Sequence, residues 1–261
     1  MPAIPQEELS TGRKPLQVLV TGFGPFAHYE ENPSWLGVKP LQNALLYTPK
    51  TSETTEPEFP HPIQVTALQV PVTYDAVLST IPGIHARPPS IPSLDATAAS
   101  PPADGYDFVF HVGVAGKGPR LEKLAHKTGY DEAQDVDGKY APIVKDSSGR
   151  ITRGFAKGYE NFDEILRTDI DVDGLVENLK KKGIQSMYPY EDPGNYLCDF
   201  IYYCSLAEAK RTADKVAHQA GVSSKHTRVL FFHCPPIGQP LTTPEVTDAI
   251  VKTIAWVCSE H

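Results

Sequence analysis

The segment Val229-Leu-Phe-Phe-His-Cys-Pro-Pro236 is the most informative stretch for the fold. Its first four residues are all apolar, which is typical of a central strand buried on both faces, although a buried helical segment has the same pattern. Comparable apolar runs, each followed by a turn signal, occur at Leu16 to Thr21, Ile63 to Val70, Phe108 to Val112 and Ile184 to Tyr188. We therefore predict five strands, with residues 229–232 near the middle of the sheet.

Helical patterns alternate with these strands. They cover Pro33 to Tyr47, Thr73 to Ile81, Asp173 to Lys182, Tyr196 to Ala220 and Thr243 to Cys258. Strand and helix in alternation predict an α/β fold, with a mostly parallel sheet covered by helices on both faces.

The chain is predicted to form a flexible tail over residues 1–15 and one α/β domain over residues 16–261. Residues 48–62 and 83–105 are rich in Pro, Ser and Thr, and we predict that both are surface insertions. Residues 129–169 are predicted to be loop-like, with a candidate hairpin at Asp137-Gly138.

Composition excludes several functional classes. The 261 residues carry a net charge of −8 without a basic stripe, which argues against nucleic-acid binding. No run approaches the roughly 20 apolar residues that span a bilayer, and the N-terminus has no apolar targeting segment, so we expect a cytoplasmic protein without membrane contact. The four cysteines match no paired zinc motif, and we expect reduced thiols, no metal and no cofactor.

The first predicted strand runs into Gly22, Gly24 and Ala27, which fit the dinucleotide fingerprint G-x-G-x-x-A. That fingerprint requires a glycine turn that opens directly into a helix. Here the helix start signals come later, where Asn32 is a candidate cap and Pro33 suits the first helical position. A dinucleotide-binding oxidoreductase is therefore kept only as an alternative.

Cys198 and His233 are the strongest candidates for chemistry. Cys198 falls in the first turn of a predicted helix, where amides and the helix dipole favour a thiolate. His233 follows a predicted strand and would emerge at the same sheet edge, where it could act as a base. His111 and His126 compete for that role, but one lies inside a strand and the other follows no turn. Cys234 with these two residues would make an incomplete zinc set.

Three further features lie at the predicted sheet edge. Phe23 and Phe26 leave the first strand together, either to hold a flat apolar ligand or to cover the loop. Backbone groups near Val114 lie in a glycine-rich exit that would let a ligand approach closely. Glu122 follows this exit, and its spacing alone indicates a solvated surface charge.

Four ordered motifs resemble the pyroglutamyl peptidase I family, the cysteine peptidases that remove an N-terminal pyroglutamate. The motifs are Thr21-Gly-Phe-Gly-Pro-Phe26 with Asn32-Pro-Ser-Trp35, Leu121-Glu-Lys-Leu-Ala-His-Lys-Thr-Gly-Tyr130, Asp192-Pro-Gly-Asn-Tyr-Leu-Cys-Asp199 and His233-Cys-Pro-Pro236. The resemblance covers most of the chain, and the sequences of the motifs are closer to those of eukaryotic members.

The resemblance implies roles for individual residues. Cys198 would be the nucleophile, His233 the base and Glu122 the partner of the imidazole. The substrate-binding residues would be Phe23 and Phe26 around the lactam ring, Val114 through its backbone, and Asn32, Tyr196 and Leu197. The resemblance also implies a single-domain three-layer α/β/α sandwich with an open twisted sheet, N-terminally pyroglutamylated peptides as substrates, and a monomer in preference to a tetramer.

The chain departs from bacterial members of this family in one motif. They carry an arginine in a D-A-R-I-P-D-N segment, whereas this chain reads Tyr130-Asp-Glu-Ala-Gln-Asp-Val136. The two insertions also exceed the family pattern. A non-catalytic interaction protein on the same scaffold therefore stands as a second alternative.

Overall fold

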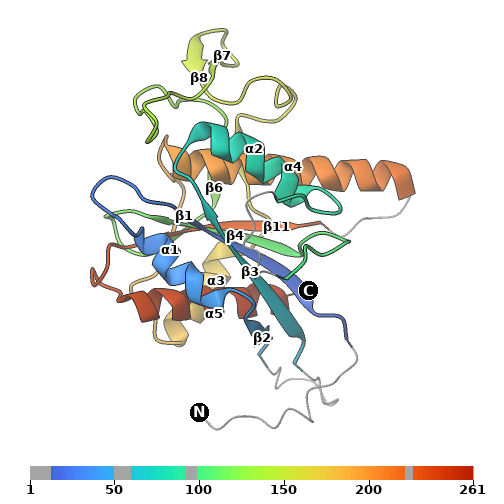
Figure 1. Cartoon of the computed structure of the whole chain (residues 1–261), viewed down its shortest axis with the longest axis vertical. Helices are drawn as coiled ribbons and strands as arrows, with labels where there is room; N and C mark the ends of the chain where they lie inside the picture. The colour runs from blue at the N-terminus through green and yellow to red at the C-terminus, as the bar shows by residue number, and fades with distance from the viewer. Residues whose placement is uncertain (1–12, 50–59, 92–98, 221–225, 261) are drawn as a thin grey trace.

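The computed structural model describes residues 13–49, 60–91, 99–220 and 226–260. Its main feature is a seven-stranded sheet in the order β10-β5-β11-β4-β1-β3-β2 (Figure 1). The strands are β1 (Leu16–Phe23), β2 (Leu45–Tyr47), β3 (Pro62–Val70), β4 (Phe108–Val114), β5 (Arg120–Glu122), β10 (Tyr188–Tyr190) and β11 (Arg228–Cys234). Strands β3, β1, β4 and β11 run parallel, while β2 and β5 run antiparallel to β3 and β11.

Helices cover both faces of this sheet (Figure 1). One face carries α2 (Tyr74–His85) and α4 (Leu197–Ala220), and the other carries α1 (Pro33–Val38), α3 (Val172–Lys181) and α5 (Thr243–Ser259). Each helical layer closes its own apolar core against the sheet. The predicted α/β/α sandwich with a mostly parallel sheet is confirmed. Within the described ranges, no helix is long and apolar enough to cross a bilayer.

Strand β11 lies between β4 and β5, so both of its faces are buried, as predicted. Because side chains alternate along a strand, Phe231 belongs to the core under α2 and α4, while Phe232 and Cys234 belong to the core under the other helices. His233 shares the face of Phe231. The alternation therefore separates His233 from Cys234, although they are neighbours in sequence.

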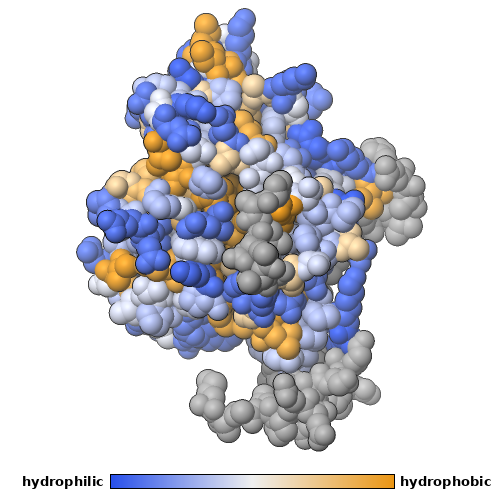
Figure 2. All heavy atoms as spheres, in the orientation of Figure 1, coloured by the Kyte–Doolittle hydropathy of each residue, from blue (hydrophilic) through white to orange (hydrophobic). Residues whose placement is uncertain are grey.

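Two small antiparallel ribbons lie outside the main sheet: β6 (Leu124–His126) with β9 (Ile165–Arg167), and β7 (Ile143–Lys145) with β8 (Ile151–Arg153). The β7–β8 hairpin projects from one end of the molecule, and hydrophobic residues gather there (Figure 2). The hairpin predicted at Asp137-Gly138 is wrong, because the chain forms only a turn there, with the Gly138 N–H on the Asp135 carbonyl at 3.0 Å.

The strand predicted at Ile184 to Tyr188 begins only at Tyr188. Ile184 instead follows the end of α3, where its N–H bonds the Leu179 carbonyl at 3.0 Å after Gly183 with a φ of +98°. This is the geometry of a glycine-capped helix end, in which an apolar residue beyond the cap packs back on the helix. The apolar run therefore completes a helix cap and adds only its last residue to the sheet.

The helix predicted at Pro33 to Tyr47 is too long. Helix α1 ends at Val38, a 3-10 turn covers Lys39–Leu41, and β2 follows. Pro40 disfavours continued α-helix at the residue before it and lacks an amide hydrogen, so it accounts for the early end.

The extent of the predicted insertions is only partly described. Helix α2 continues to His85, so the segment predicted from residue 83 begins inside a helix. Residues 50–59 and 92–98 of the two insertions, and residues 1–12 of the predicted tail, lie outside the described residues.

Candidate active site

The candidate site lies on the sheet face under α4, where β1, β4 and β11 end. Helix α4 begins at Leu197, so Cys198 occupies its first turn as predicted. The Cys198 side chain approaches the sheet directly above Gly113: a Cβ added to Gly113 would lie 2.9 Å from the Cys198 Sγ and 3.4 Å from the Phe23 ring. The missing side chain at Gly113 thus provides the space for the thiol.

His233 lies beside this point. It pairs with Gly113 in the parallel register of β11 and β4. Neighbouring strands are about 4.8 Å apart, so the imidazole and the thiol occupy adjacent positions on one face of the sheet. The two residues that the sequence predicted at one edge are brought together.

Glu122 completes a buried chain of polar groups with His233. The Nδ1 of His233 and Oε1 of Glu122 are 2.6 Å apart, and the two side chains are 2% and 0% exposed. The surface location indicated by spacing alone is wrong, because β5 inserts Glu122 against β11 opposite Phe231. The family resemblance, and not the spacing, predicted that Glu122 is the partner of the His233 imidazole.

Arg120 is a site residue that the sequence analysis missed. Its Nε donates a hydrogen bond of 2.9 Å to the same Glu122 Oε1, and its side chain is also buried. Arg120 lies two residues before Glu122 and so shares its face of β5, but a three-residue strand is too short to show this period in the sequence.

Burial sets the protonation states of the thiol and the imidazole. It raises the pKa of Cys198 to about 12, with the Glu122 carboxylate adding to the rise and Arg120 opposing it. The helix N-terminus therefore does not lower the pKa as the sequence predicted. Burial also lowers the pKa of His233, against the opposing effect of the hydrogen bond that His233 donates to Glu122. The resting site is a neutral thiol beside a neutral imidazole.

The competing histidines make different contacts. His111 is fully buried, pairs with the Thr21 hydroxyl at 2.8 Å and has a pKa lowered to about 3 by burial. His126 pairs through Nδ1 with Oδ2 of Asp199 at 3.0 Å, and its backbone N–H donates to Oδ1 at 2.9 Å. Asp199, the residue after Cys198, is a second polar group that the sequence analysis missed.

The other cysteines stay away from the site. Cys234 faces the opposite core from Cys198, which explains why the zinc set considered above does not assemble. Cys204 and Cys258 are buried. No cluster of three or more metal-binding side chains occurs among the residues that the structure describes.

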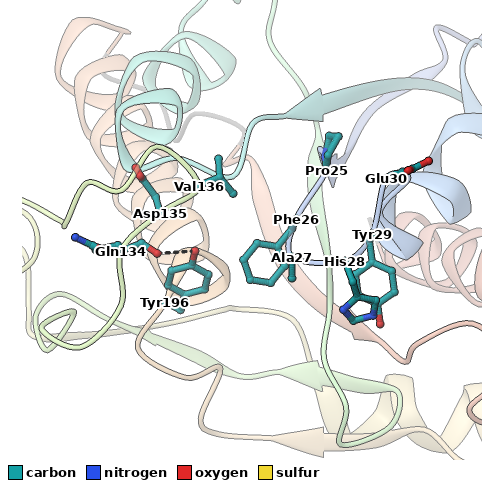
Figure 3. Close-up of a pocket in the computed structure, with 10 residues that line it drawn as sticks. All are labelled: Pro25, Phe26, Ala27, His28, Tyr29, Glu30, Gln134, Asp135, Val136 and Tyr196. Carbon is teal, nitrogen blue, oxygen red and sulfur yellow. Dashed lines mark hydrogen bonds between the residues drawn. The ribbon is translucent and has the colours of Figure 1, made fainter.

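A cavity of about 750 Å³ lies next to the thiol helix (Figure 3). Its walls are the loop at residues 25–30, the loop at residues 134–136 and Tyr196. The rings of Phe26 and Tyr196 lie 5.8 Å apart at its centre, and the Tyr196 hydroxyl donates to the Gln134 carbonyl at 3.0 Å (Figure 3). Phe23, in contrast, is buried beside Gly113 and Cys198, so the two phenylalanines occupy different depths.

The remaining predicted binding residues support the loops of the site. Asn32 is buried, donates to the Gly24 carbonyl at 3.0 Å and accepts from the Ser34 N–H at 3.1 Å, so it caps α1 as predicted and ties down the loop before it. Leu197 is buried in the core under α4. Val114, the last residue of β4, packs against the opposite core.

The glycine pattern after β1 has a packing role. A Cβ at Gly22 would lie 2.8 Å from the Trp35 Cα, so this glycine permits the close approach of β1 and α1. The helix begins only at Pro33, after an intervening loop. The turn does not open into a helix N-terminus, which is the feature that a dinucleotide site needs.

The fold is α/β, and at its sheet edge the partly exposed Cys198 lies beside the buried pair of His233 and Glu122. The chain is similar to human pyroglutamyl-peptidase 1, with 28% identity over 236 residues that cover 89% of this chain and 85% of the human protein. It is 24% identical to the pyrrolidone-carboxylate peptidase of Bacillus subtilis, over 91% of this chain and 88% of that protein. These matches confirm the resemblance that the four motifs indicated.

A solved structure has the same fold. The pyroglutamyl peptidase I of Bacillus amyloliquefaciens superposes with a TM-score of 0.62 at 21% identity, covering 93% of this chain and 95% of that chain. No protein-family model matches the chain.

Proposed function

We propose that this protein is a cysteine exopeptidase that hydrolyses the bond after an N-terminal pyroglutamyl residue. The observation that carries the proposal is the Cys198 thiol above Gly113, beside a buried imidazole whose Nδ1 is held by Glu122. The similarity to pyroglutamyl peptidases over most of both chains supports the substrate class.

Glu122 fixes the tautomer of His233. With the Nδ1 hydrogen donated to the carboxylate, the Nε2 lone pair is available to accept the Cys198 proton. A neutral thiol next to a neutral base favours proton transfer during attack, so the reactive thiolate forms when the substrate is in place. This state follows from the raised pKa of Cys198 and the lowered pKa of His233, both caused first by burial.

The reaction has two stages. In the first, Sγ bonds the pyroglutamyl carbonyl carbon, and the imidazolium gives its proton to the departing amine as the C–N bond breaks. In the second, water attacks the thioester with help from His233, which releases pyroglutamate and returns the proton to Cys198. Amides of the first turn of α4, which have no partner four residues earlier in the helix, are placed to hold the oxyanion.

The apolar walls favour an uncharged substrate end. The lactam ring of pyroglutamate is flat and neutral, Phe23 lies beside the thiol, and Phe26 and Tyr196 line the neighbouring cavity. An ammonium group at a free glutaminyl terminus would lose hydration at a cost of several kcal/mol unless paired. We expect kcat/KM for a pyroglutamyl amide to exceed that for prolyl and glutaminyl amides by about 100-fold or more.

The test is hydrolysis of a pyroglutamyl fluorogenic amide by the purified full chain, with and without iodoacetamide. Turnover that iodoacetamide abolishes supports the proposal. An intact fold without turnover would favour the interaction protein, and comparable rates on all three amides would remove the specificity assignment.

A further inference from the structure

The buried guanidinium of Arg120 belongs to the same polar chain as His233. Glu122 Oε1 accepts from Arg120 Nε at 2.9 Å and from His233 Nδ1 at 2.6 Å, so one oxygen serves both. Arg120 is also directly opposite His233 in the antiparallel register of β5 and β11. The Arg120 and Glu122 side chains are only 5% and 0% exposed, so water screens their charges little.

The guanidinium does not use all of its hydrogen-bond donors. Its Nη1 has no hydrogen-bond partner in the described part of the chain, and its Cζ lies 5.2 Å from the centre of the Tyr190 ring. An arginine that served only to join two elements would be expected to use its donors fully. Its one ion pair among the described residues is with Glu122.

The positive charge of Arg120 changes the pKa of both Cys198 and His233 in the same direction. It disfavours the imidazolium form of His233 and favours the thiolate form of Cys198, so it lowers the pKa of both groups relative to a site without it. It also pairs with the Glu122 carboxylate, so the two buried charges offset each other.

In the described part of the chain, other titratable groups lie on the elements packed around His233. They include Tyr190 on β10, Cys198, Asp199 and Tyr202 on α4, His111 on β4, and Cys234 after His233 on β11. Of these, Asp199 is paired with His126, and Tyr202 donates to the Glu122 carbonyl at 3.0 Å.

We infer that Arg120 is a positioning residue that sets the proton distribution between Cys198 and His233 through Glu122, the carboxylate that Arg120 and His233 share. The place of this effect in the reaction rests on the proposed function, but the effect itself is a property of the free protein. It follows that Arg120 influences thiol reactivity without touching the substrate.

The experiment compares Arg120→Gln, Arg120→Met and Arg120→Lys with the wild-type chain. Iodoacetamide labelling of Cys198 is followed by mass spectrometry of its peptide between about pH 5 and 9, without substrate. Lys123→Gln is the matched control, because it removes a neighbouring cation whose Nζ pairs with Asp173 at 2.8 Å on α3, on the other side of the sheet. Kinetics on the pyroglutamyl amide are measured over the same pH range.

Loss of the cation should slow labelling roughly threefold or more at each pH of this range, which corresponds to a rise of about half a unit in the pKa of Cys198. Arg120→Lys should restore most of this shift, and Lys123→Gln should match the wild type. In the kinetics, kcat should fall with KM unchanged within about twofold, because Arg120 does not contact substrate.

Superimposable labelling profiles for folded Arg120→Gln or Arg120→Met and the wild type would overturn the inference. So would an equal shift in Lys123→Gln. If neither neutral variant folds while Arg120→Lys folds with an unchanged profile, Arg120 is structural and the inference is wrong. A wild-type chain that does not turn over the amide would refute the proposed function alone, since the labelling still measures the effect of Arg120.

Discussion

Two histidine–carboxylate pairs lie on either side of the α4 N-terminus, and they differ in burial. His233 and Glu122 are 2% and 0% exposed at 2.6 Å, whereas the His126 side chain is 27% exposed at 3.0 Å from the buried Asp199. The pKa shifts are opposite in direction: burial lowers that of His233, while the hydrogen bond from Asp199 raises that of His126.

The contrast shows how the same two side-chain types serve different purposes. In the His233 pair, burial outweighs the carboxylate, so the imidazole stays neutral beside the thiol. In the His126 pair, Asp199 also accepts the backbone N–H of His126, so the carboxylate fastens β6 to the helix that carries Cys198. We interpret the first pair as the reacting one and the second as a tether.

The largest expected effect separates Cys198 from its neighbour on the same helix. Cys198→Ala should lower kcat by a factor of at least about 10⁴, because no other group supplies the nucleophile. Cys204→Ala is the matched control: Cys204 is fully buried with its Sγ 3.3 Å from the Tyr159 hydroxyl, and we expect about 1 kcal/mol of lost stability with activity kept within about twofold. Equal losses of activity in both variants would contradict the assignment.

The two histidines can be separated by parallel asparagine substitutions. His233→Asn should lower kcat by about 10² to 10⁴-fold because the base is lost. His126→Asn should leave kcat within about tenfold but cost about 1 to 3 kcal/mol of unfolding free energy, since a buried Asp199 oxygen loses its partner. The measurements are amide hydrolysis and urea unfolding, and the reverse pattern would exchange the two roles.

The glycine beneath the thiol gives a smaller, geometric effect. A Cβ at Gly113 would lie 2.8 Å from the Phe231 ring and 2.9 Å from Cys198 Sγ, so Gly113→Ala should displace the thiol and lower kcat by about 10 to 100-fold. Gly116→Ala is the control, because a Cβ there meets nothing within 4 Å. Equal kcat values for the two variants would show that the thiol is not seated on Gly113.

The sequence predicted the sheet core well because its strands carry uninterrupted apolar runs. Residues 229–232 could be read as buried on two faces without tertiary information. The failures occur where tertiary context decides the structure: Ile184 packs onto a helix end, and Leu45 to Tyr47 become an edge strand after a proline-containing turn. The short strands β5 and β10 have too few residues to show a period.

For the candidate site, the sequence placed Cys198 and His233 at one edge because each follows or precedes a clear element. Glu122 could not be found from spacing, since its burial depends on β5 pairing with β11 across more than a hundred residues of chain. Arg120 was missed for the same reason, and Asp199 because its partner His126 lies 73 residues earlier in the chain. The direction of the Cys198 pKa shift was mistaken because a helix N-terminus is visible in sequence, whereas burial is not.

The smallest expected effect concerns how the tether responds to pH. The pKa of Asp199 is raised by burial from 3.8 to about 6, and that of His126 is raised above 6.5 by its hydrogen bond to Asp199. In both cases the folded state holds its proton to a higher pH than the unfolded state does, so stability falls as pH rises. The stabilisation of the folded state that Asp199 contributes is lost between about pH 4 and 6. The stabilisation that His126 contributes is present at pH 6.5 and is lost as pH rises through its folded-state pKa.

His126→Asn removes the stabilisation that His126 contributes and also raises the pKa of Asp199 further, because His126 opposes the rise caused by burial. We therefore expect the melting temperatures of the wild type and this variant to differ most near pH 6.5. At about pH 9 the difference should be smaller by a few degrees. Thermal unfolding in matched buffers measures the difference, and His126→Gln, which also cannot become charged, should behave in the same way. A difference that widens with pH would mean that His126 is neutral in the folded protein. The contrast with His233 would then rest on exposure alone and not on charge.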